Sequence, residues 1–345
     1  RNSIMKRRAL TFRAGPWWWL GLAALLLLSF SIASASPNQP ASVTLSEAWE
    51  IMPDLPYAVE RPAVAALNGY IHIVGGIASN DVVTNTHVIY DPLGKDYAIA
   101  LEPYPLRVEN ASAVAAGGRL FVIGGWDAAS KEATDAVYYN REEYDWWWAV
   151  DPLLTPVSGA GAAVVGDTIY VIGGWNSKDL WLNTVQAYNL ATEEWVLKKP
   201  MPTPRCELGV AVVNGMIYAL GGSIATGSTT AVERYDPAAN TWSKVASLPV
   251  IRTDFATAVR DGHIYVLGGS QLWATTPDPT AVIYDPLSGS WTYTSNLPTP
   301  RRSNEAAVVD QLIYVIGGHD GTDLSAANEA LDFTRWIYLP FTMKH

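Results

Sequence analysis

Cysteine is almost absent from the chain, since Cys206 is the only one in 345 residues. A single cysteine excludes an intrachain disulfide and a paired-cysteine metal site, so the fold must be stabilised by packing alone. Histidine is also scarce, and His72, His87, His263 and His319 show no metal-ligand spacing. The sequence contains no phosphate-binding glycine loop and no evident Ser-His-Asp arrangement. We therefore expect no metal and no cofactor, and we assign no catalytic residue.

Positive charge is the second shortage, with 23 Lys and Arg against 33 Asp and Glu. Five of the basic residues lie within residues 1–35, which leaves 18 basic against 33 acidic residues in the remainder, a formal charge of −15. Such an acidic surface argues against the phosphate backbone of a nucleic acid or an anionic membrane as the main partner.

The N-terminal segment has the pattern of a targeting sequence. Basic residues from Lys6 to Arg13 precede an uncharged run from Trp17 to Ala33, and Ala33-Ser34-Ala35 matches an A-x-A cleavage site. We expect residues 1–35 to be a signal peptide, or an N-terminal anchor if they are not cleaved, with residues 36–45 as a linker. Residues 46–345 then form one domain that is secreted, periplasmic or at the cell surface. If uncleaved, residues 1–35 are the only expected membrane contact.

Six Gly-Gly pairs recur along this domain, at steps of 49, 49, 48, 47 and 49 residues. Each pair ends a β-branched and aromatic run, such as Tyr70-Ile71-His72-Ile73-Val74, which is typical of a strand buried on both faces. The pairs are Gly75-Gly76, Gly124-Gly125, Gly173-Gly174, Gly221-Gly222, Gly268-Gly269 and Gly317-Gly318.

Two further aromatic positions follow each pair. The first lies 14 to 16 residues after the first glycine and is Tyr90, Tyr139, Tyr188, Tyr235, Tyr284 and, in the last unit, Phe333. The second lies seven residues later in five units and is Tyr97, Trp146, Trp195, Trp242 and Trp291. This pattern resembles the kelch repeat, whose period of about 50 residues also fits. The resemblance implies an all-β fold, a six-bladed β-propeller with four strands in each blade.

The two ends of this domain are expected to meet. Residues 48–56, Ala-Trp-Glu-Ile-Met-Pro-Asp-Leu-Pro, match the outermost strand of a unit, whereas the last unit has no room for such a strand after Phe333. We predict that the strand around Trp49 completes the sixth blade beside Glu329 to Phe333. The competing interpretation is that residues 335–341 form that strand.

Candidate binding residues lie in two sets of loops that share one face of the predicted propeller. The loops after Gly-Gly carry Trp126, Trp175, Trp273, His319 and Asp320, and the loops that enter each blade carry Arg205, Arg252, Arg301, Asp254 and Glu305. Indole rings suit sugars or peptide side chains, and an inner ring of Arg suits carboxylates. The alternative is that the three arginines brace adjacent loops by bonding to backbone carbonyls or nearby acids.

We therefore expect a monomeric binding module whose loop face contacts a protein or a glycan, and we expect no enzyme activity. The alternative is a carbohydrate-acting enzyme, such as a sugar epimerase or mutarotase, on the same scaffold. His319, Asp320 and Glu305 are the only acid–base cluster that the sequence offers for it.

Overall fold

The computed structural model describes residues 48–141, 146–271, 274 and 276–333. The predicted signal or anchor segment and the linker that follows it lie outside the described residues, as do residues 335–341. Within the described part, no helix has the length and hydropathy of a transmembrane span.

The long strands form six four-stranded sheets, numbered here along the chain. Every pairing between neighbouring strands is antiparallel. From the innermost to the outermost strand, sheet 1 is β2 (Ala63–Leu67), β3 (Tyr70–Val74), β6 (His87–Asp91) and β7 (Asp96–Ile99); sheet 2 is β9 (Ser112–Ala116), β10 (Arg119–Ile123), β13 (Val137–Asn140) and β14 (Trp147–Val150); sheet 3 is β15 (Gly161–Val165), β16 (Thr168–Ile172), β19 (Val185–Asn189) and β20 (Glu194–Leu197); sheet 4 is β21 (Gly209–Val213), β22 (Met216–Leu220), β25 (Val232–Asp236) and β26 (Thr241–Lys244); sheet 5 is β27 (Ala256–Arg260), β28 (His263–Leu267), β29 (Ala281–Asp285) and β30 (Ser290–Tyr293); sheet 6 is β31 (Glu305–Val309), β32 (Leu312–Ile316), β33 (Asn328–Asp332) and β1 (Ala48–Ile51).

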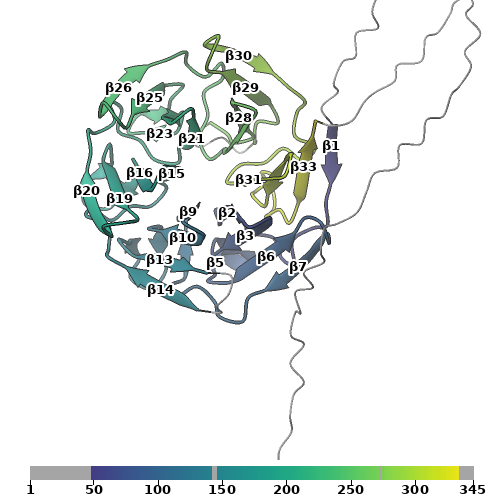
Figure 1. The fold of residues 1–345 in the computed structure, drawn as a ribbon. Coiled ribbons are helices and arrows are strands. Elements are labelled where there is room, and N and C mark those ends of the chain that lie inside the picture. Colours follow the sequence, from purple (N-terminus) through teal and green to yellow (C-terminus); the bar gives the residue numbers. More distant parts are fainter. Residues whose placement is uncertain (1–47, 142–145, 272–273, 275, 334–345) are drawn as a thin grey trace, which may run out of the picture. The chain divides into compact units, whose positions relative to one another are not determined.

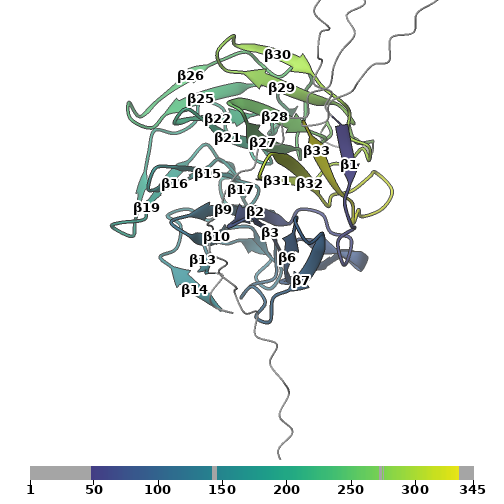
Figure 2. The same ribbon diagram turned by 45° about the vertical axis from the view of Figure 1, so that its right-hand side comes forward.

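The six sheets surround a common axis, with their first strands at the centre and their fourth strands at the rim (Figure 1). Each innermost strand contacts the innermost strand on either side, and the circuit closes where β2 meets β31. The turned view in Figure 2 shows the same inner strands around the axis. The short elements are β4 (Ile77–Ala78), η1 (Ser79–Asp81), β5 (Val82–Val83), β8 (Val108–Glu109), β11 (Trp126–Asp127), β12 (Glu132–Ala133), β17 (Trp175–Asn176), β18 (Leu180–Trp181), β23 (Ser223–Ile224) and β24 (Gly227–Ser228).

The N-terminal strand completes the last sheet, as predicted. β1 pairs with β33 so that Trp49 lies opposite Leu331, and the indole Nε1 of Trp49 donates to the carbonyl of Ser295 at 3.2 Å. The two ends of the described chain are therefore held in one sheet, which joins the first and last units of the repeat.

The Gly-Gly pairs join each sheet to the next one. The N–H of the second glycine donates to a backbone carbonyl in the segment that enters the following sheet, over distances of 2.7 to 3.0 Å. A Cβ atom on the first glycine would lie only 2.5 to 2.8 Å from that same carbonyl, so any side chain would push the sheets apart. The six carbonyls belong to Val108, Val157, Arg205, Arg252, Arg301 and Val59, and the last of these closes the circuit from sheet 6 to sheet 1.

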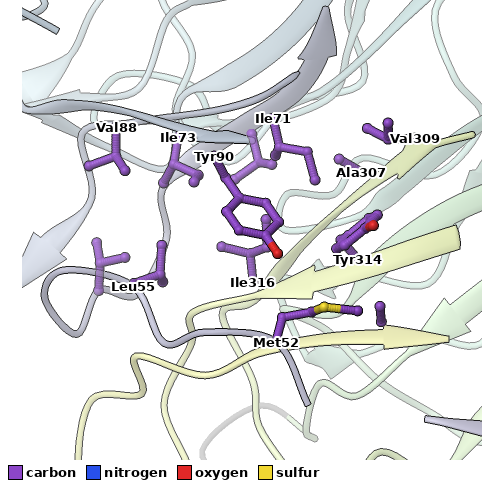
Figure 3. Packing of buried hydrophobic residues seen from close by; sticks show 13 residues of the cluster. Met52, Leu55, Ile71, Ile73, Val88, Tyr90, Ala307, Val309, Tyr314 and Ile316 are labelled. Atoms are coloured by element: carbon purple, nitrogen blue, oxygen red, sulfur yellow. The ribbon is translucent and has the colours of Figure 1, made fainter. Parts of the chain in front are cut away.

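The hydrophobic core is divided into six clusters, each between two neighbouring sheets. Figure 3 shows the cluster between sheets 6 and 1, where Tyr90 lies near Tyr314 with ring centroids 5.9 Å apart and Met52 packs from the connecting segment. These side chains are buried, with Tyr90 at 0% exposure. Aromatic residues of the repeat therefore fill the space between these two sheets.

Three of the predicted repeat positions, Phe333, Tyr139 and Trp146, were wrong. In sheet 6, Leu331 rather than Phe333 occupies the tyrosine position, because Leu331 pairs with Ile313 and Trp49 as Tyr284 pairs with Ile264 and Trp291. Phe333 instead packs against Tyr265 of sheet 5, with ring centroids 5.4 Å apart.

In sheet 2 the strand pairing is displaced by one residue, so Trp147 and not Trp146 takes the consensus tryptophan position. Asn140 pairs with Leu120 and Trp147, while Trp147 packs against Tyr104 of the segment from sheet 1. Trp146 precedes the strand and is 52% exposed. Asn140 therefore takes the tyrosine position in place of Tyr139. The spacing of seven residues still separates it from Trp147, but Asn140 has no aromatic ring by which the sequence could reveal it.

Candidate functional site

Six residues from the six sheets form a closed ring at one end of the axis, here called the mouth ring. Each lies 14 residues before the first glycine of its pair and has a left-handed backbone with φ between 51° and 62°. Each N–H donates to the carbonyl of the equivalent residue in the preceding sheet, over 2.7 to 3.3 Å, and the N–H of the first donates to the carbonyl of the last. The members are Arg61, Asn110, Gly159, Glu207, Asp254 and Ser303.

Below the mouth ring, a channel runs between the innermost strands. Its space open to water is about 160 Å³, enough for several water molecules. Many of the side chains on its wall are small, such as Ser112, Ala113 and Ala162, and its acidic residues are Glu207, Asp254 and Glu305. The small residues arise because six innermost strands must approach one another around the axis.

A second hollow opens beside the mouth ring over sheets 2, 3 and 4, and its space open to water is about 310 Å³. Trp126, Trp175 and Trp181 line it, and we call it the Trp pocket. The rings of Trp126 and Trp175 are 5.8 Å apart at an angle of 44°, and Trp181 lies opposite Trp175 in the β17–β18 hairpin. The structure thus brings two of the three predicted tryptophans together, whereas Trp273 lies outside the described residues.

The Trp pocket and the channel share four mouth-ring residues, Arg61, Asn110, Gly159 and Glu207. Arg61 forms an ion pair with Glu109 at 3.3 Å, and both side chains remain partly exposed. The two hollows are therefore adjacent parts of one polar and aromatic surface around the axis.

The carboxyls of Asp254 and Glu305 are held in this channel without a direct cationic partner among the described residues. Burial, assisted by the Glu207 carboxylate and opposed by Arg61 and Arg302, raises the pKa of Asp254 to about 7. Burial likewise raises the pKa of Glu305 to about 8, assisted by the nearby charge of Asp254. Both groups therefore exchange protons near neutral pH, and both line the channel.

The expectation that Arg205, Arg252 and Arg301 form an inner ligand-binding ring was wrong. All three side chains are 0% exposed and point into their own sheets. Arg205 donates to the carbonyls of Ala219 and Ala231 and pairs with Glu233 at 3.0 Å. The same pattern links Arg301 to Val315, Ala327 and Glu329, and links Arg252 to Gly268, Thr280 and Asp278.

The three arginines therefore brace the chain by bonding to backbone carbonyls and nearby acids, which was the alternative interpretation. Burial lowers the pKa of Arg205 and Arg301 to about 10 in each case, opposed by the paired glutamate, so both remain charged at neutral pH. Arg205 and Arg301 tie the segment entering a sheet to the second and third strands of that sheet, and Arg252 ties it to the connection between those strands. Each brace therefore fixes the backbone just before the mouth ring.

The proposed His319, Asp320 and Glu305 cluster does not form. The Asp320 carboxylate accepts the N–H groups of Thr322 and Asp323, which lower its pKa, and so closes its own turn. His319 accepts the N–H of Gly321 in that turn. Glu305 faces the channel instead, so the acidic neighbour that the structure provides for it is Asp254.

Glu207, Arg61 and Glu109 were not among the candidate binding residues chosen from the sequence. Counting back 14 residues from each Gly-Gly pair would have found the whole mouth ring, because this position varies in residue type but not in spacing. Within the described part of the chain, no three His, Cys, Asp or Glu side chains gather as a metal site would require.

Four-stranded sheets arranged face to face around an axis, with a loop surface at one end, define the β-propeller class of proteins. A family model described as the KLHDC2/KLHL20/DRC7 Kelch-repeats domain matches residues 61–269, and the Kelch motif matches residues 251–298 and 300–340. The chain therefore belongs to the kelch-repeat family.

Comparison with solved structures supports the same fold. A structure titled "Structure of YjhT" is similar with a TM-score of 0.70 at 15% sequence identity, over 82% of this chain and 97% of that chain. At that identity the likeness concerns the fold alone. A search of curated proteins returned no match.

Proposed function

We propose that this chain is a six-bladed kelch propeller that acts as a binding module, with the Trp pocket as the anchor of its contact surface. The observation that carries the proposal is the convergence of Trp126, Trp175 and Trp181 with Arg61 and Glu207 in one hollow at the axis. Tryptophan is the residue most enriched among energetic centres of interfaces, since one indole excludes much water at little entropic cost.

The surroundings of the pocket support a preformed surface. The mouth ring is held by backbone hydrogen bonds, and the buried arginine braces hold the segments that lead into it. The Asp127 carboxylate accepts the N–H groups of Ala129 and Ser130, and the Asn176 side chain likewise closes the next turn, which fixes the loops that bear Trp126 and Trp175. A rigid surface pays little ordering entropy when a partner binds.

The N-terminal pattern extends the proposal to location and domain organisation. Residues 1–35 carry the signal or anchor pattern, so the domain at residues 46–345 would act outside the cytoplasm as a monomer. Expression of the full chain, followed by N-terminal sequencing and fractionation, tests this. Retention of an intact N-terminus in the cytoplasm would contradict it.

The binding proposal is tested by screening the purified protein against a glycan array and a displayed peptide library. For any ligand found, replacing both Trp126 and Trp175 with Ala is expected to weaken binding by about tenfold or more. Trp146→Ala is the matched control, because Trp146 is an exposed tryptophan that precedes the outermost strand of sheet 2, away from the Trp pocket. Ligands that bind the double variant as well as the original protein would place the contact surface elsewhere.

A carbohydrate-acting enzyme is the second candidate, and one observation favours it. Asp254 and Glu305 combine pKa values of about 7 and 8 with positions on a channel wide enough for water, which suits groups that transfer protons at neutral pH. Adding each sugar that binds as a pure anomer, and following its optical rotation, tests this. If the protein accelerates anomer interconversion and Glu305→Gln removes the acceleration, the chain is an enzyme. If no bound sugar interconverts faster, the binding module remains the proposed function.

A further inference from the structure

The mouth of the channel carries more negative than positive charge. Burial lowers the pKa of the Arg61 guanidinium, yet the carboxylates of Asp254, Glu207, Glu109 and Glu60 outweigh burial and raise it. One guanidinium is thus surrounded by four acidic side chains. An anionic ligand that approached Arg61 would have to displace or oppose this excess of carboxylates.

The negative surplus continues into the channel. Glu305 lies next to Asp254, and burial is the main reason that each holds its proton near neutral pH; the carboxylate of Glu207 assists at Asp254, and that of Asp254 assists at Glu305. Arg302 is the other cation that acts on Asp254, and its Nη1 already donates to the carbonyl of Ala274 at 3.0 Å. The charged groups around Asp254 are therefore Glu207, Glu60 and Glu305 on the acidic side and Arg61 and Arg302 on the basic side.

A buried hydroxyl in the same wall also lacks a partner. Ser303 is 5% exposed, belongs to the mouth ring and lines the channel, and its Oγ makes no hydrogen bond within the described part of the chain. Leaving a buried polar atom unsatisfied costs about 1–3 kcal/mol, so such atoms usually have a ligand or a water as partner. The unpartnered Ser303 hydroxyl is therefore a second indication of a bound ligand, and it does not depend on the acidic charge.

The Trp pocket provides the matching approach. Indole faces attract cations more strongly than other aromatic rings do, and they also cover aliphatic stems. Glu109 and Glu207 line the same hollow as the three tryptophans. Aromatic walls with carboxylates at one end are the combination that recognises an ammonium group on an apolar chain.

We propose that the Trp pocket and the channel mouth bind a lysine side chain of a partner polypeptide. The methylenes would lie along Trp126 and Trp175, and the ammonium would reach Glu207, Asp254 and Ser303. An ammonium has three donors, and these residues from three neighbouring sheets supply two carboxylates and one hydroxyl as acceptors. A compact ammonium on a thin stem also suits a channel walled by Ala, Gly and Ser better than a planar guanidinium does.

This inference rests on the proposed binding function, and it adds a dependence on pH. The lysine remains charged up to about pH 10, whereas Asp254 and Glu305 lose protons as the pH rises through about 7 and 8. Bound ammonium favours the ionised carboxylates, so binding should release protons and should strengthen between pH 6 and pH 9.

The test is calorimetric titration of the full protein with the peptide acetyl-Gly-Lys-Gly-amide at low ionic strength. The comparison peptides carry Nε-acetyl-lysine, which is neutral, or glutamate, which is anionic, in place of lysine; glucosamine tests an amino sugar as the source of the ammonium. The lysine peptide should bind about tenfold or more tightly than either comparison peptide. Its enthalpy should vary with the ionisation enthalpy of the buffer, which reports proton release.

Asp254→Asn is the diagnostic variant, because Asn tolerates the left-handed backbone at this position, where φ is 55°. It should weaken the lysine peptide by about tenfold and flatten the pH profile. Glu102→Gln, which removes an exposed carboxylate from the loop after β7, should change neither.

The outcomes separate the two proposals. Equal or tighter binding of the acetylated or the glutamate peptide, lost in Trp126→Ala, would show that the pocket binds ligands but that the lysine assignment is wrong. Binding of glucosamine without the lysine peptide would overturn the assignment in the same way. If peptides bind and Trp126→Ala has no effect on any of them, the failure lies with the proposed site. No binding at millimolar lysine peptide would also refute the inference.

Discussion

The Arg205–Glu233 brace allows a quantitative test of how the propeller is stabilised. Both side chains are 0% exposed, with Nη2 of Arg205 3.0 Å from the Glu233 carboxylate. The arginine also donates to the carbonyls of Ala231 and Ala219 at 3.0 Å. Replacing Arg205 with Met would leave a buried carboxylate without its cation and two carbonyls without these donors, which should cost about 3–5 kcal/mol.

Sheet 1 shows that the same place can be filled without charge. Val59 occupies the position of Arg205, and Val88 occupies the position of Glu233, opposite Ile73 as Glu233 lies opposite Ala219. Both valines are buried, with exposures of 1% and 0%. A double variant of sheet 4, with Arg205→Met and Glu233→Leu, should therefore be more stable than either single variant.

The measurement is equilibrium urea unfolding, followed by tryptophan fluorescence and circular dichroism, for the original protein, both single variants and the double variant. The loss in the double variant should fall short of the summed single losses by about 2 kcal/mol or more, since a double-mutant cycle isolates the coupling of the pair. Additive losses would show that the ion pair contributes no specific coupling and would refute the reasoning.

Three further predictions concern stability. Trp49→Ala should lower the free energy of unfolding by about 2–3 kcal/mol, because Trp49 packs in the cluster between sheets 5 and 6. A loss below about 0.5 kcal/mol, measured by urea unfolding, would show that β1 does not stabilise the closure of the ring. Gly75→Ala places a Cβ 2.5 Å from the carbonyl of Val108, whereas Gly118→Ala meets nothing within 4 Å at nearly the same φ, +69° against +68°. The former should be the more destabilising by about 2 kcal/mol, and equal melting temperatures would contradict the steric account of Gly-Gly.

The buried histidines predict acid sensitivity. Burial lowers the pKa of His72 to about 4 and of His87 to about 3, below the ordinary 6.5, and His72 assists the shift of His87. The unfolded chain therefore binds more protons, so stability that is complete above pH 6.5 should fall as the pH drops towards 3. Between pH 8 and pH 5 the loss should be about 2 kcal/mol for each histidine. His72→Phe, which restores the aromatic residue of the other repeats, should reduce this loss; an unchanged pH profile of urea unfolding would disprove the assignment.

The sequence by itself determined the repeat and its closure. Gly-Gly spacing marked every join between sheets, because only glycine allows the carbonyl of the next sheet to approach so closely. Trp49 could be matched to the missing outer strand because its surroundings copy those of Trp242. Local patterns of this kind depend on neighbours along the chain or on a fixed repeat, and both are visible in one dimension.

Only the tertiary structure decided the register in sheet 2 and the composition of the site. The seven-residue spacing from Tyr139 selects Trp146, whereas the strand pairing places Trp147 in that role, opposite Asn140. Arg205 and Asp254 both lie in segments that enter a sheet, yet one is buried against Glu233 and the other faces the channel. Which way such a side chain points depends on partners from distant parts of the chain. The arginines expected at the binding face are therefore buried, and acidic side chains line the channel instead.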